Sequence, residues 1–534
     1  MLQFLSPGTR LSKLDRAEGA HRGTLRLSLA DVVAIVAIYG LVHAALRMAA
    51  SPTIGQDDVI ANVFAQSLEI GYWLRNPPLY DWLLWGVQQV TGPTLVGFLL
   101  LKYALLLCAA VLLYAIMLRI AGDRQWAALT ALAPALCYQI GWNVHEGVTH
   151  TMTLICVLAA SFYVFLGVIE RGRIADYLLF GICVGLGGLA KYNYAGFLGV
   201  LVVAACFQRP LRERLVDPRI LISAAVALLM VAPFYLWLFG GGGDLAALTD
   251  ETLNPRSDWH IEHRIWWTLW RPVYVTLNFL APLLIVVPLL FPQALKSLWR
   301  RQGRGHEDAD RPDIERLIFH MLLLGLVVMA AGIMVFGVQR LVARHMHPFL
   351  LLGIVWLMLQ ARHGYTHPRQ LTRFMNVLVA AVALVLVLRA LNLFVAGEPF
   401  CKKCRQLVPF DRLAAELRTG GFDGGILIAA NRHIAGNMRV HFPNAVIVSL
   451  DNPKYRPPAL EPADEDQVAV VWNAATDGEA VPQAAEPDLV RLGWTGTQRP
   501  TAIDVAWDHW RPRVAAKRTP WRFLVVERQA ARAD

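Results

Sequence analysis

Apolar residues along the chain gather into long runs separated by short polar segments. We distinguish eleven runs, at about 31–49, 94–119, 126–142, 148–168, 176–190, 194–207, 219–239, 272–292, 317–338, 345–360 and 373–395. A helix needs roughly 20 apolar residues to cross a bilayer, so the longer runs predict spanning helices and the shorter ones have soft boundaries. The weakest run, 194–207, is also compatible with a broken helix shared with 176–190. The pattern predicts a mainly α, polytopic membrane domain at 31–395 with about eleven transmembrane helices.

After Gly397 the apolar runs shorten, and Pro, Asp and Glu become more frequent. Apolar residues then recur with the periods of short helices and strands. The predicted helices are 410–419 and 435–441, and the predicted strands are 425–430, 445–450, 468–472, 502–507 and 523–526. We therefore expect a small α/β domain at 396–534.

Composition agrees with a membrane protein, because 56% of the 534 residues are hydrophobic and only 17% are charged. The net charge of +10 would suit nucleic acid, but its distribution indicates topology instead. With the N-terminal lead (1–30) in the cytoplasm, the inner segments carry 22 Lys and Arg residues and the outer loops carry seven. We expect a multi-pass protein of a bacterial inner membrane, with an uncleaved first helix, a periplasmic C-terminal domain and no nucleic-acid partner.

The first outer loop, 50–93, concentrates polar chemistry directly after the first apolar run. It holds the adjacent acids Asp57 and Asp58, a helix-length segment and the turn Asn76-Pro77-Pro78. Carboxylates beside a low-dielectric region are costly, which favours a functional role. The alternative is that one of the two acids caps the next helix. The loop is long enough for two short helices lying on the membrane.

This loop resembles the first outer loop of the GT-C glycosyltransferases of family 39 type, which include lipid A aminoarabinose transferase and protein O-mannosyltransferases. The acidic pair is followed in the family's order by Gln66, Gly71-Tyr72 and Pro77-Pro78. The chain differs from the family where Asp58 replaces a Glu and Asn76 replaces a His. The resemblance covers roughly the first 360 residues and implies a GT-C-like fold.

The resemblance implies transfer of a sugar, with inversion, from a polyprenyl-phosphate-linked donor to an acceptor on the outer face. Asp57 falls on the family's catalytic acid and would act as general base, with Asp58 as its neighbour. Lys191 lies in a turn that resembles one placed near the lipid phosphate, although a lysine extending to the membrane surface is equally compatible. Arg344, in a segment resembling the family's late Arg-aromatic-x-x-Pro element, and Arg75 would also bind the phosphate.

Several other polar residues are candidates for the acceptor and sugar pocket. They are His145, Glu146 and His150 near the start of the fourth run, together with Tyr72 and His345. A divalent cation is an option for the histidine pair, but its spacing matches no standard metal signature, and neutral hydrogen-bonded histidines are favoured. A flexible lid over the sugar is one interpretation of the second outer loop, 240–271; a plain exposed loop is the other.

Cys401 and Cys404 follow the last apolar run on the outer side, where a two-residue spacing favours a local disulfide over half of a metal site. Membrane lipids, the lipid-linked donor and an envelope glycan, lipid or protein acceptor are the expected partners. Two other function classes remain open: a transporter or flippase of lipid-linked sugars, and a catalytically silent envelope scaffold. The chain shows no clear half-to-half repeat of the kind that transporters have.

Overall fold

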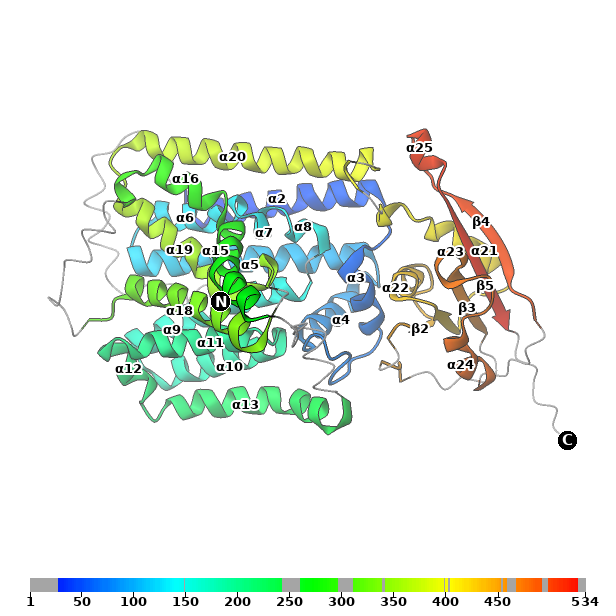
Figure 1. Cartoon of the computed structure of the whole chain (residues 1–534), viewed down its shortest axis with the longest axis horizontal. Coiled ribbons are helices and arrows are strands. Elements are labelled where there is room, and N and C mark those ends of the chain that lie inside the picture. Colours follow the sequence, from blue (N-terminus) through cyan, green and yellow to red (C-terminus); the bar gives the residue numbers. More distant parts are fainter. Residues whose placement is uncertain are drawn as a thin grey trace.

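The computed structural model describes residues 27–147, 149–242, 260–295, 311–338, 341–397, 399–401, 404–452, 455–458, 467–491 and 498–526. A helical bundle and a smaller α/β domain lie end to end along the long axis (Figure 1). Nearly all of the predicted N-terminal lead, and the centre of the predicted second outer loop, lie outside the described residues. The lid interpretation is therefore not addressed.

The bundle consists of helices that follow the apolar runs. They are α2 (Leu29–Ala50), α5 (Leu95–Ala121), α6 (Arg124–Leu132), α9 (His150–Glu170), α10 (Ile174–Ala190), α11 (Tyr194–Cys206), α13 (Ile220–Trp237), α15 (Ile261–Leu280), α16 (Leu283–Leu290), α18 (Ile314–Phe336), α19 (His347–His363) and α20 (Pro368–Ala390). Within the described ranges, six helices are long and apolar enough to cross a membrane. They are α2, α5, α9, α18 and the helices Ile220–Gly240 and Pro368–Val395, which include the π-helical ends of α13 and α20.

Two of the predicted spans are interrupted. The run at 126–142 forms α6, a 3₁₀ turn (η2, Ala133–Leu136) and the short α7 (Tyr138–Gly141), because Pro134 cannot donate the backbone hydrogen bond that a continuous helix needs. The run at 272–292 is divided between α15 and α16 at Pro282 for the same reason. The runs at 176–190 and 194–207 form two separate helices joined by a short turn.

The first outer loop forms two short helices, α3 (Gln56–Phe64) and α4 (Leu79–Thr91), as predicted. They lie at the end of the bundle that faces the α/β domain (Figure 1). Gly71, in the segment between them, lies against Trp237, and a Cβ at residue 71 would overlap the indole ring. A glycine is required there by this close approach.

The C-terminal domain contains a five-stranded sheet in the order β2-β1-β3-β5-β4. β1 (Ile426–Ala429) pairs in parallel with β2 (Val446–Ser449) and β3 (Val468–Asn473), whereas β5 (Arg518–Val526) pairs antiparallel with β3 and with β4 (Thr501–Ala506). α21 (Phe410–Thr419) and α22 (Arg432–His441) complete the predicted set. Every predicted element is present, and the short α23 (Ala474–Asp477) and α24 (Glu486–Arg491) were not predicted.

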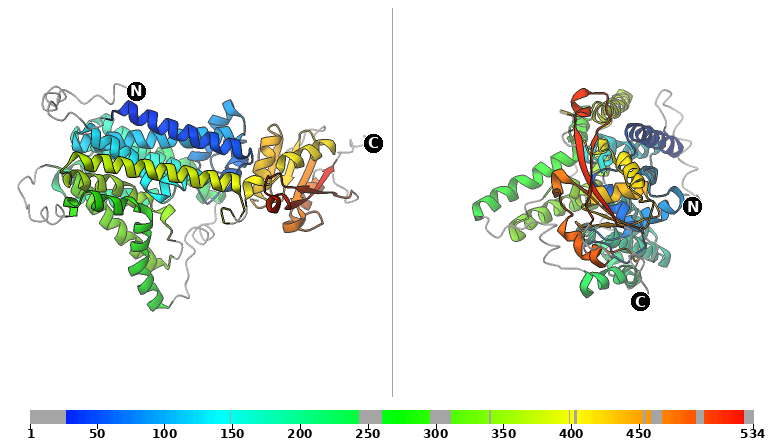
Figure 2. Two further views of the ribbon diagram at one scale, coloured as in Figure 1. Left: turned by 90° about the horizontal axis from the view of Figure 1, so that it is seen from above. Right: turned by 90° about the vertical axis from the view of Figure 1, so that its right-hand side faces the viewer.

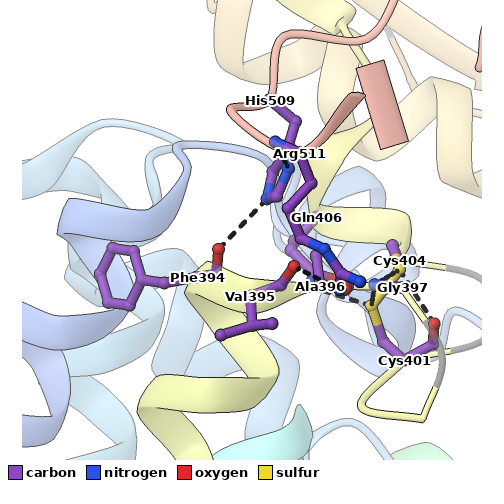
Figure 3. The surroundings of a disulfide bond; sticks show 9 residues. All are labelled: Phe394, Val395, Ala396, Gly397, Cys401, Cys404, Gln406, His509 and Arg511. Atoms are coloured by element: carbon purple, nitrogen blue, oxygen red, sulfur yellow. Dashed lines mark hydrogen bonds between the residues drawn. A yellow bond between two sulfur atoms is a disulfide. The ribbon is translucent and has the colours of Figure 1, made fainter. Parts of the chain in front are cut away.

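The last bundle helix enters the α/β domain through a tightly bonded junction (Figure 3). His509 and Trp510 lie 3.2 Å and 2.8 Å from the Phe394 carbonyl oxygen, and the Arg511 guanidinium donates to the carbonyls of Val395 and Ala396. These contacts satisfy carbonyls that the helix end leaves without partners. Cys401 and Cys404 form a disulfide beside this junction.

Candidate active site

Asp57 and Asp58 lie in the first turn of α3, where the helix dipole favours negative charge. The helix is preceded by Gly55 and has no side-chain cap, so neither acid has the capping role considered from the sequence. Consecutive residues of a helix point about 100° apart, and the two acids consequently meet different surroundings. Asp57 is exposed, whereas Asp58 is buried.

Asp57 shares its surroundings with the three predicted phosphate-binding cations. Asp57, Arg344 and Arg75 all act electrostatically on Lys191, whose Nζ donates to Thr151 Oγ1 at 2.9 Å. Burial lowers the pKa of Lys191 to about 8, and the charge of Asp57 opposes this lowering. In this cation cluster (Arg75, Lys191 and Arg344), the two arginines are exposed, as Asp57 is, whereas Lys191 is partly buried.

The turn between α10 and α11 holds the cation cluster together. Lys191 directly follows α10 as its C-terminal cap residue, and the next two residues each bond a different loop. Tyr192 donates to the Leu74 carbonyl at 2.8 Å, next to Arg75. Asn193 donates to the His345 carbonyl at 2.8 Å, next to Arg344. The two bonds place all three cations, which are remote in sequence, around one position.

Two of the predicted pocket histidines lie near this cluster. His345 follows Arg344 in a 3₁₀ turn (η4, Ala343–His345) and is only partly buried. His150 begins α9, and its Nε2 lies 3.8 Å from Oδ2 of Asp81 on α4. Burial raises the pKa of Asp81 well above its usual value, so a neutral carboxyl is favoured there. His150 therefore packs against α4, where its ring contacts that of Tyr80 and its side chain is 11% exposed.

The assignment of Tyr72 to the sugar pocket is not supported by its position. Tyr72 is buried, its hydroxyl donates to the Ser67 carbonyl at 2.8 Å, and its ring packs on Phe64 and Tyr455. Tyr455 belongs to the C-terminal domain, so Tyr72 contributes to the contact between the two domains. An aromatic residue in an interfacial loop can line a pocket or join a core, and only tertiary packing separates the two cases.

Asp58 belongs to a second group of charges at the end of the bundle, in which Glu146 is exposed and the other members are buried. Lys102 of α5 and Arg47 of α2 act electrostatically on Asp58, and both also act on Glu146 in the short helix α8 (Val144–Gly147). Burial raises the pKa of both carboxyls, and the two cations oppose that effect. Glu146 thus shares its two cations with Asp58, and the cations around Asp57 are a different set.

His145 joins this second group through hydrogen bonds. Its Nε2 lies 2.5 Å from the Tyr39 hydroxyl, its Nδ1 lies 3.0 Å from the Tyr103 hydroxyl, and its ring stacks on His43 at 3.8 Å. Both ring nitrogens are therefore used in hydrogen bonds, which leaves His145 poorly placed as a metal ligand. Nowhere in the described part of the chain do three His, Cys, Asp or Glu side chains gather as a metal site.

The C-terminal domain contacts the acid helix directly through α22. Asn437 bonds both the amide and the carbonyl of Ile54, which precedes α3, at 2.7 and 3.2 Å. The buried Arg439 guanidinium donates to the carbonyls of Asn62 and Ala65, at 3.0 Å in the second case, and to Gln88 Oε1 of α4 at 2.7 Å. These bonds satisfy carbonyls at the C-terminal end of α3 and fix its orientation.

Gln66, part of the family-like motif, bonds the same domain. Its amide group donates to the Ile447 carbonyl at 2.9 Å and accepts from the Ile447 amide at 3.0 Å. It thereby pairs with the edge strand β2 as a neighbouring strand would. The motif glutamine consequently has a docking role in this chain.

Sequence reasoning missed several charged residues of the site region. They are Arg47, Lys102 and Arg389, which lie inside apolar helices, and Asp81 on α4. An ionisable residue inside an apolar span is itself a signal of function, and it would have identified the first three.

Comparisons with known proteins bear on the class of protein to which the chain is similar. Residues 75–237 match the family described as dolichyl-phosphate-mannose-protein mannosyltransferase. The chain is 28% identical over 495 residues to the lipopolysaccharide core galacturonosyltransferase RgtB of Rhizobium johnstonii, covering 91% of this chain and 96% of that protein. It is 29% identical over 456 residues to RgtA, a lipopolysaccharide core galacturonosyltransferase of the same organism, covering 84% of this chain and 88% of that protein.

Among solved structures, ArnT from Cupriavidus metallidurans in the apo state matches with a TM-score of 0.48 and 13% identity, covering 92% of this chain and 98% of that chain. That similarity is too low to carry a functional argument. The family match spans Arg75 and Lys191, and the similarity to two glycosyltransferases runs over most of the chain. Together with the apolar helices, these matches identify the chain as a membrane glycosyltransferase.

Proposed function

We propose that the protein transfers a uronic acid residue, galacturonate, from a polyprenyl-phosphate donor to a saccharide hydroxyl of the lipopolysaccharide core. The reaction class rests on the family match, and the sugar and acceptor are suggested by the two relatives, whose names give a galacturonosyltransferase of the lipopolysaccharide core. The observation that carries the mechanism is the exposed Asp57 beside Arg75, Lys191 and Arg344.

Charge balance supports an acidic sugar. The cation cluster brings three positive charges against the single carboxylate of Asp57, which leaves a net charge of +2. A polyprenyl phosphodiester carries one negative charge and a uronate carboxylate carries another. A donor with both groups would neutralise the site, whereas a neutral hexose would leave one cation without a partner. Two guanidinium groups in the cluster suit this task, because guanidinium binds phosphate and carboxylate through two parallel hydrogen bonds.

In the proposed reaction, Asp57 accepts the proton of the acceptor hydroxyl as its oxygen attacks the anomeric carbon. The new carbon–oxygen bond forms on the face opposite the phosphate, and the bond from the anomeric carbon to the phosphate oxygen breaks. The polyprenyl phosphate leaves with the bonding electron pair, and its added negative charge is stabilised by Lys191 and the two arginines. The configuration at the anomeric carbon is inverted.

A direct test uses the purified full-length protein in lipid nanodiscs with lipopolysaccharide core acceptor and two donors, polyprenyl-phosphate galacturonate and polyprenyl-phosphate galactose. Mass spectrometry of the acceptor should show addition of the uronate and at least about ten-fold less addition of the neutral hexose, the loss that one missing charged hydrogen bond produces. Equal use of both donors would contradict the uronate assignment. Absence of transfer from any polyprenyl-phosphate sugar would contradict the donor class.

A charge variant separates the sugar contact from the phosphate contact. If one of the two arginines binds the uronate carboxylate, its replacement in Arg75→Gln or Arg344→Gln should lower the rate of uronate transfer and leave the rate of hexose transfer unchanged. The difference between the two rates should therefore become smaller. Arg412 on α21 is exposed on the C-terminal domain, and Arg412→Gln is a matched control that should leave both rates unchanged. Equal losses for both donors in each arginine variant would assign both arginines to the phosphate.

A further inference from the structure

The helices α2 and α20 lie next to each other along one side of the bundle (Figure 2). Side chains of these helices line an apolar groove. Its volume is about 450 Å³, and it is lined by side chains of α2, α5, α20 and the η2 region. α2 packs on α5 and α6, whereas α20 packs on η2 and α16, and the groove lies between these pairs. Ile38 of α2 and Val379 of α20 are exposed at its rim, so the groove is open toward the surroundings of the bundle.

The three helices that supply most of the lining, α2, α5 and α20, each carry a cation on the groove face beyond the lining residues, at the same end of the groove. On α20 the lining residues Leu378, Val382 and Leu386 are spaced by four, and Arg389 follows three residues later on the same face. On α2 the face of Tyr39 and His43 continues to Arg47.

On α5, which runs in the opposite direction, the face of Leu113, Ala109 and Leu106 continues to Lys102. The three cations therefore gather at the end of the groove nearest the C-terminal domain. A groove that is apolar along its length and cationic at one end has the polarity of a single amphiphile with an anionic headgroup.

Polar atoms without partners mark the cationic end. Arg389 is 2% exposed, and its Nε and Nη1 atoms make no hydrogen bond. His43, which lines the groove and is 1% exposed, has two ring nitrogens that also make none. Arg389 acts electrostatically on His43 and on Arg47, which places the three side chains in one group. Buried polar atoms of this kind are normally satisfied, and an anionic group with several oxygen acceptors would satisfy the donors of Arg389.

The charges at this end sum to a single excess cation. Arg47, Lys102 and Arg389 are opposed by Asp58 and Glu146, with the histidines counted as neutral. One net positive charge inside an apolar region is costly unless an anion neutralises it. A phosphodiester supplies one negative charge and oxygen acceptors for guanidinium groups.

We propose that this groove binds an anionic glycerophospholipid of the bilayer, with one acyl chain along α2 and α20 and its phosphodiester at Arg389, Arg47 and Lys102. The opening between the two helices gives a lipid lateral access from the membrane. Lipids with several phosphates and many chains exceed the single net charge and the single groove. The bound phosphate lies on the Asp58 side of the acid pair and is separate from the cation cluster around Lys191.

Photo-crosslinking with the full-length protein in nanodiscs tests this site. The probes are phosphatidylglycerol and phosphatidylcholine carrying the same photoreactive acyl chain, and labelled peptides are identified by mass spectrometry. Phosphatidylglycerol should label the groove-lining segments of α2 and α20, and phosphatidylcholine should label them about ten-fold less, as expected for a ligand whose charge balance is lost. Equal labelling by both probes would overturn the proposal.

Three variants make the test specific. Arg389→Gln should reduce phosphatidylglycerol labelling about ten-fold, whereas Arg373→Gln, an exposed arginine at the opposite end of α20, should not change it. Val382→Trp should block labelling by filling the groove while leaving the cations in place. The two variants alter the site independently, one at its cationic end and one along the groove. Unchanged labelling in both would overturn the proposal, and the result from a well-folded variant stands if the other folds poorly.

Competition separates this site from the donor site. Excess polyprenyl phosphate should leave the labelling unchanged; displacement would overturn the glycerophospholipid assignment and make the groove part of the donor site. Labelling requires no sugar transfer, so it can be repeated in Asp57→Asn. A failure of the proposed transfer reaction and a failure of this lipid site therefore give different results.

Discussion

Gly436 of α22 packs directly against the backbone of Val59 in α3, so that a Cβ at residue 436 would overlap the Val59 carbonyl and lie 2.6 Å from its Cα. Val59 follows the acid pair in the same helix. The C-terminal domain is therefore in contact with the helix that carries the candidate general base, and the bonds of Asn437 and Arg439 to the α3 region reinforce this contact. The C-terminal domain is part of the framework that orients Asp57.

Gly436→Ala should reduce transfer without removing any charged group of the site. The added methyl group meets backbone that cannot move aside cheaply, so either α22 or α3 must shift, and overpacking of this kind costs about 1–3 kcal/mol. We expect a lower melting temperature and a lower kcat, measured on the purified protein. Gly424→Ala is the control, because a Cβ there meets no atom within 4 Å. Equal behaviour of both variants would show that the domain contact does not position the acid helix.

Asp57→Asn and Asp58→Asn should fail in different ways. Asn at residue 57 keeps the size of the side chain but cannot accept the acceptor's proton, so transfer should fall by about two to four orders of magnitude with an unchanged melting temperature. Asn at residue 58 leaves Lys102 and Arg47 without their buried counter-charge and should destabilise the protein by about 3–5 kcal/mol. Donor binding should persist in Asp57→Asn, because the phosphate is held by cations. Full activity of the Asp57→Asn variant would show that Asp57 is not the general base.

Lys191 should give the reaction an alkaline limit. Burial lowers its pKa from the usual 10.5 to about 8, so the free enzyme carries this cation below pH 8 and loses it as the pH rises further. The value of kcat/KM for the donor should decline above about pH 8, since this parameter reports the free enzyme. Lys191→Arg should move this limit beyond the accessible range, because guanidinium stays protonated. If kcat/KM of Lys191→Arg declined over the same alkaline pH range, the decline would have to be assigned to another titrating group.

The C-terminal domain should lie outside the cytoplasm. An enzyme reporter that is active only outside the cytoplasm, fused after Asp534, should be active, because the excess of Lys and Arg falls on the opposite side of the bundle. A fusion after Val216, in a predicted inner segment, is the matched control and should be inactive. The reverse pattern would invert the topology and move the site to the cytoplasmic face.

Local pattern in the sequence determined most of the secondary structure. The helix predicted at 410–419 has those bounds in α21, and the five predicted strands are the five strands of the sheet. The apolar runs became helices, and two of the runs are interrupted beside a proline that removes a backbone donor, as at Pro134. These features depend on residues near each other in the chain, through periodicity, backbone donors and solvent exposure, which is why the sequence alone suffices for them.

The membrane character, the glycosyltransferase class and the acid pair were likewise accessible from composition and from the motif around Asp57. The sequence could not show that Asp57 and Asp58 face different groups of charges, because that depends on what packs against each side of α3. Nor could it show that Tyr72 and Gln66 belong to a domain contact. The amino-acid sequence alone does not distinguish motif residues that hold the two domains together from motif residues that take part in the chemistry.

Only the tertiary structure brought Arg75, Lys191 and Arg344 to one position and Arg47, Lys102 and Arg389 to another. Each set combines residues from distant parts of the chain, and each is placed by packing and by hydrogen bonds such as those of Tyr192 and Asn193. A residue's own neighbours in sequence decide whether it is helical and how much apolar surface it offers. Which charges meet across helices is decided by the long-range packing that buries those surfaces together.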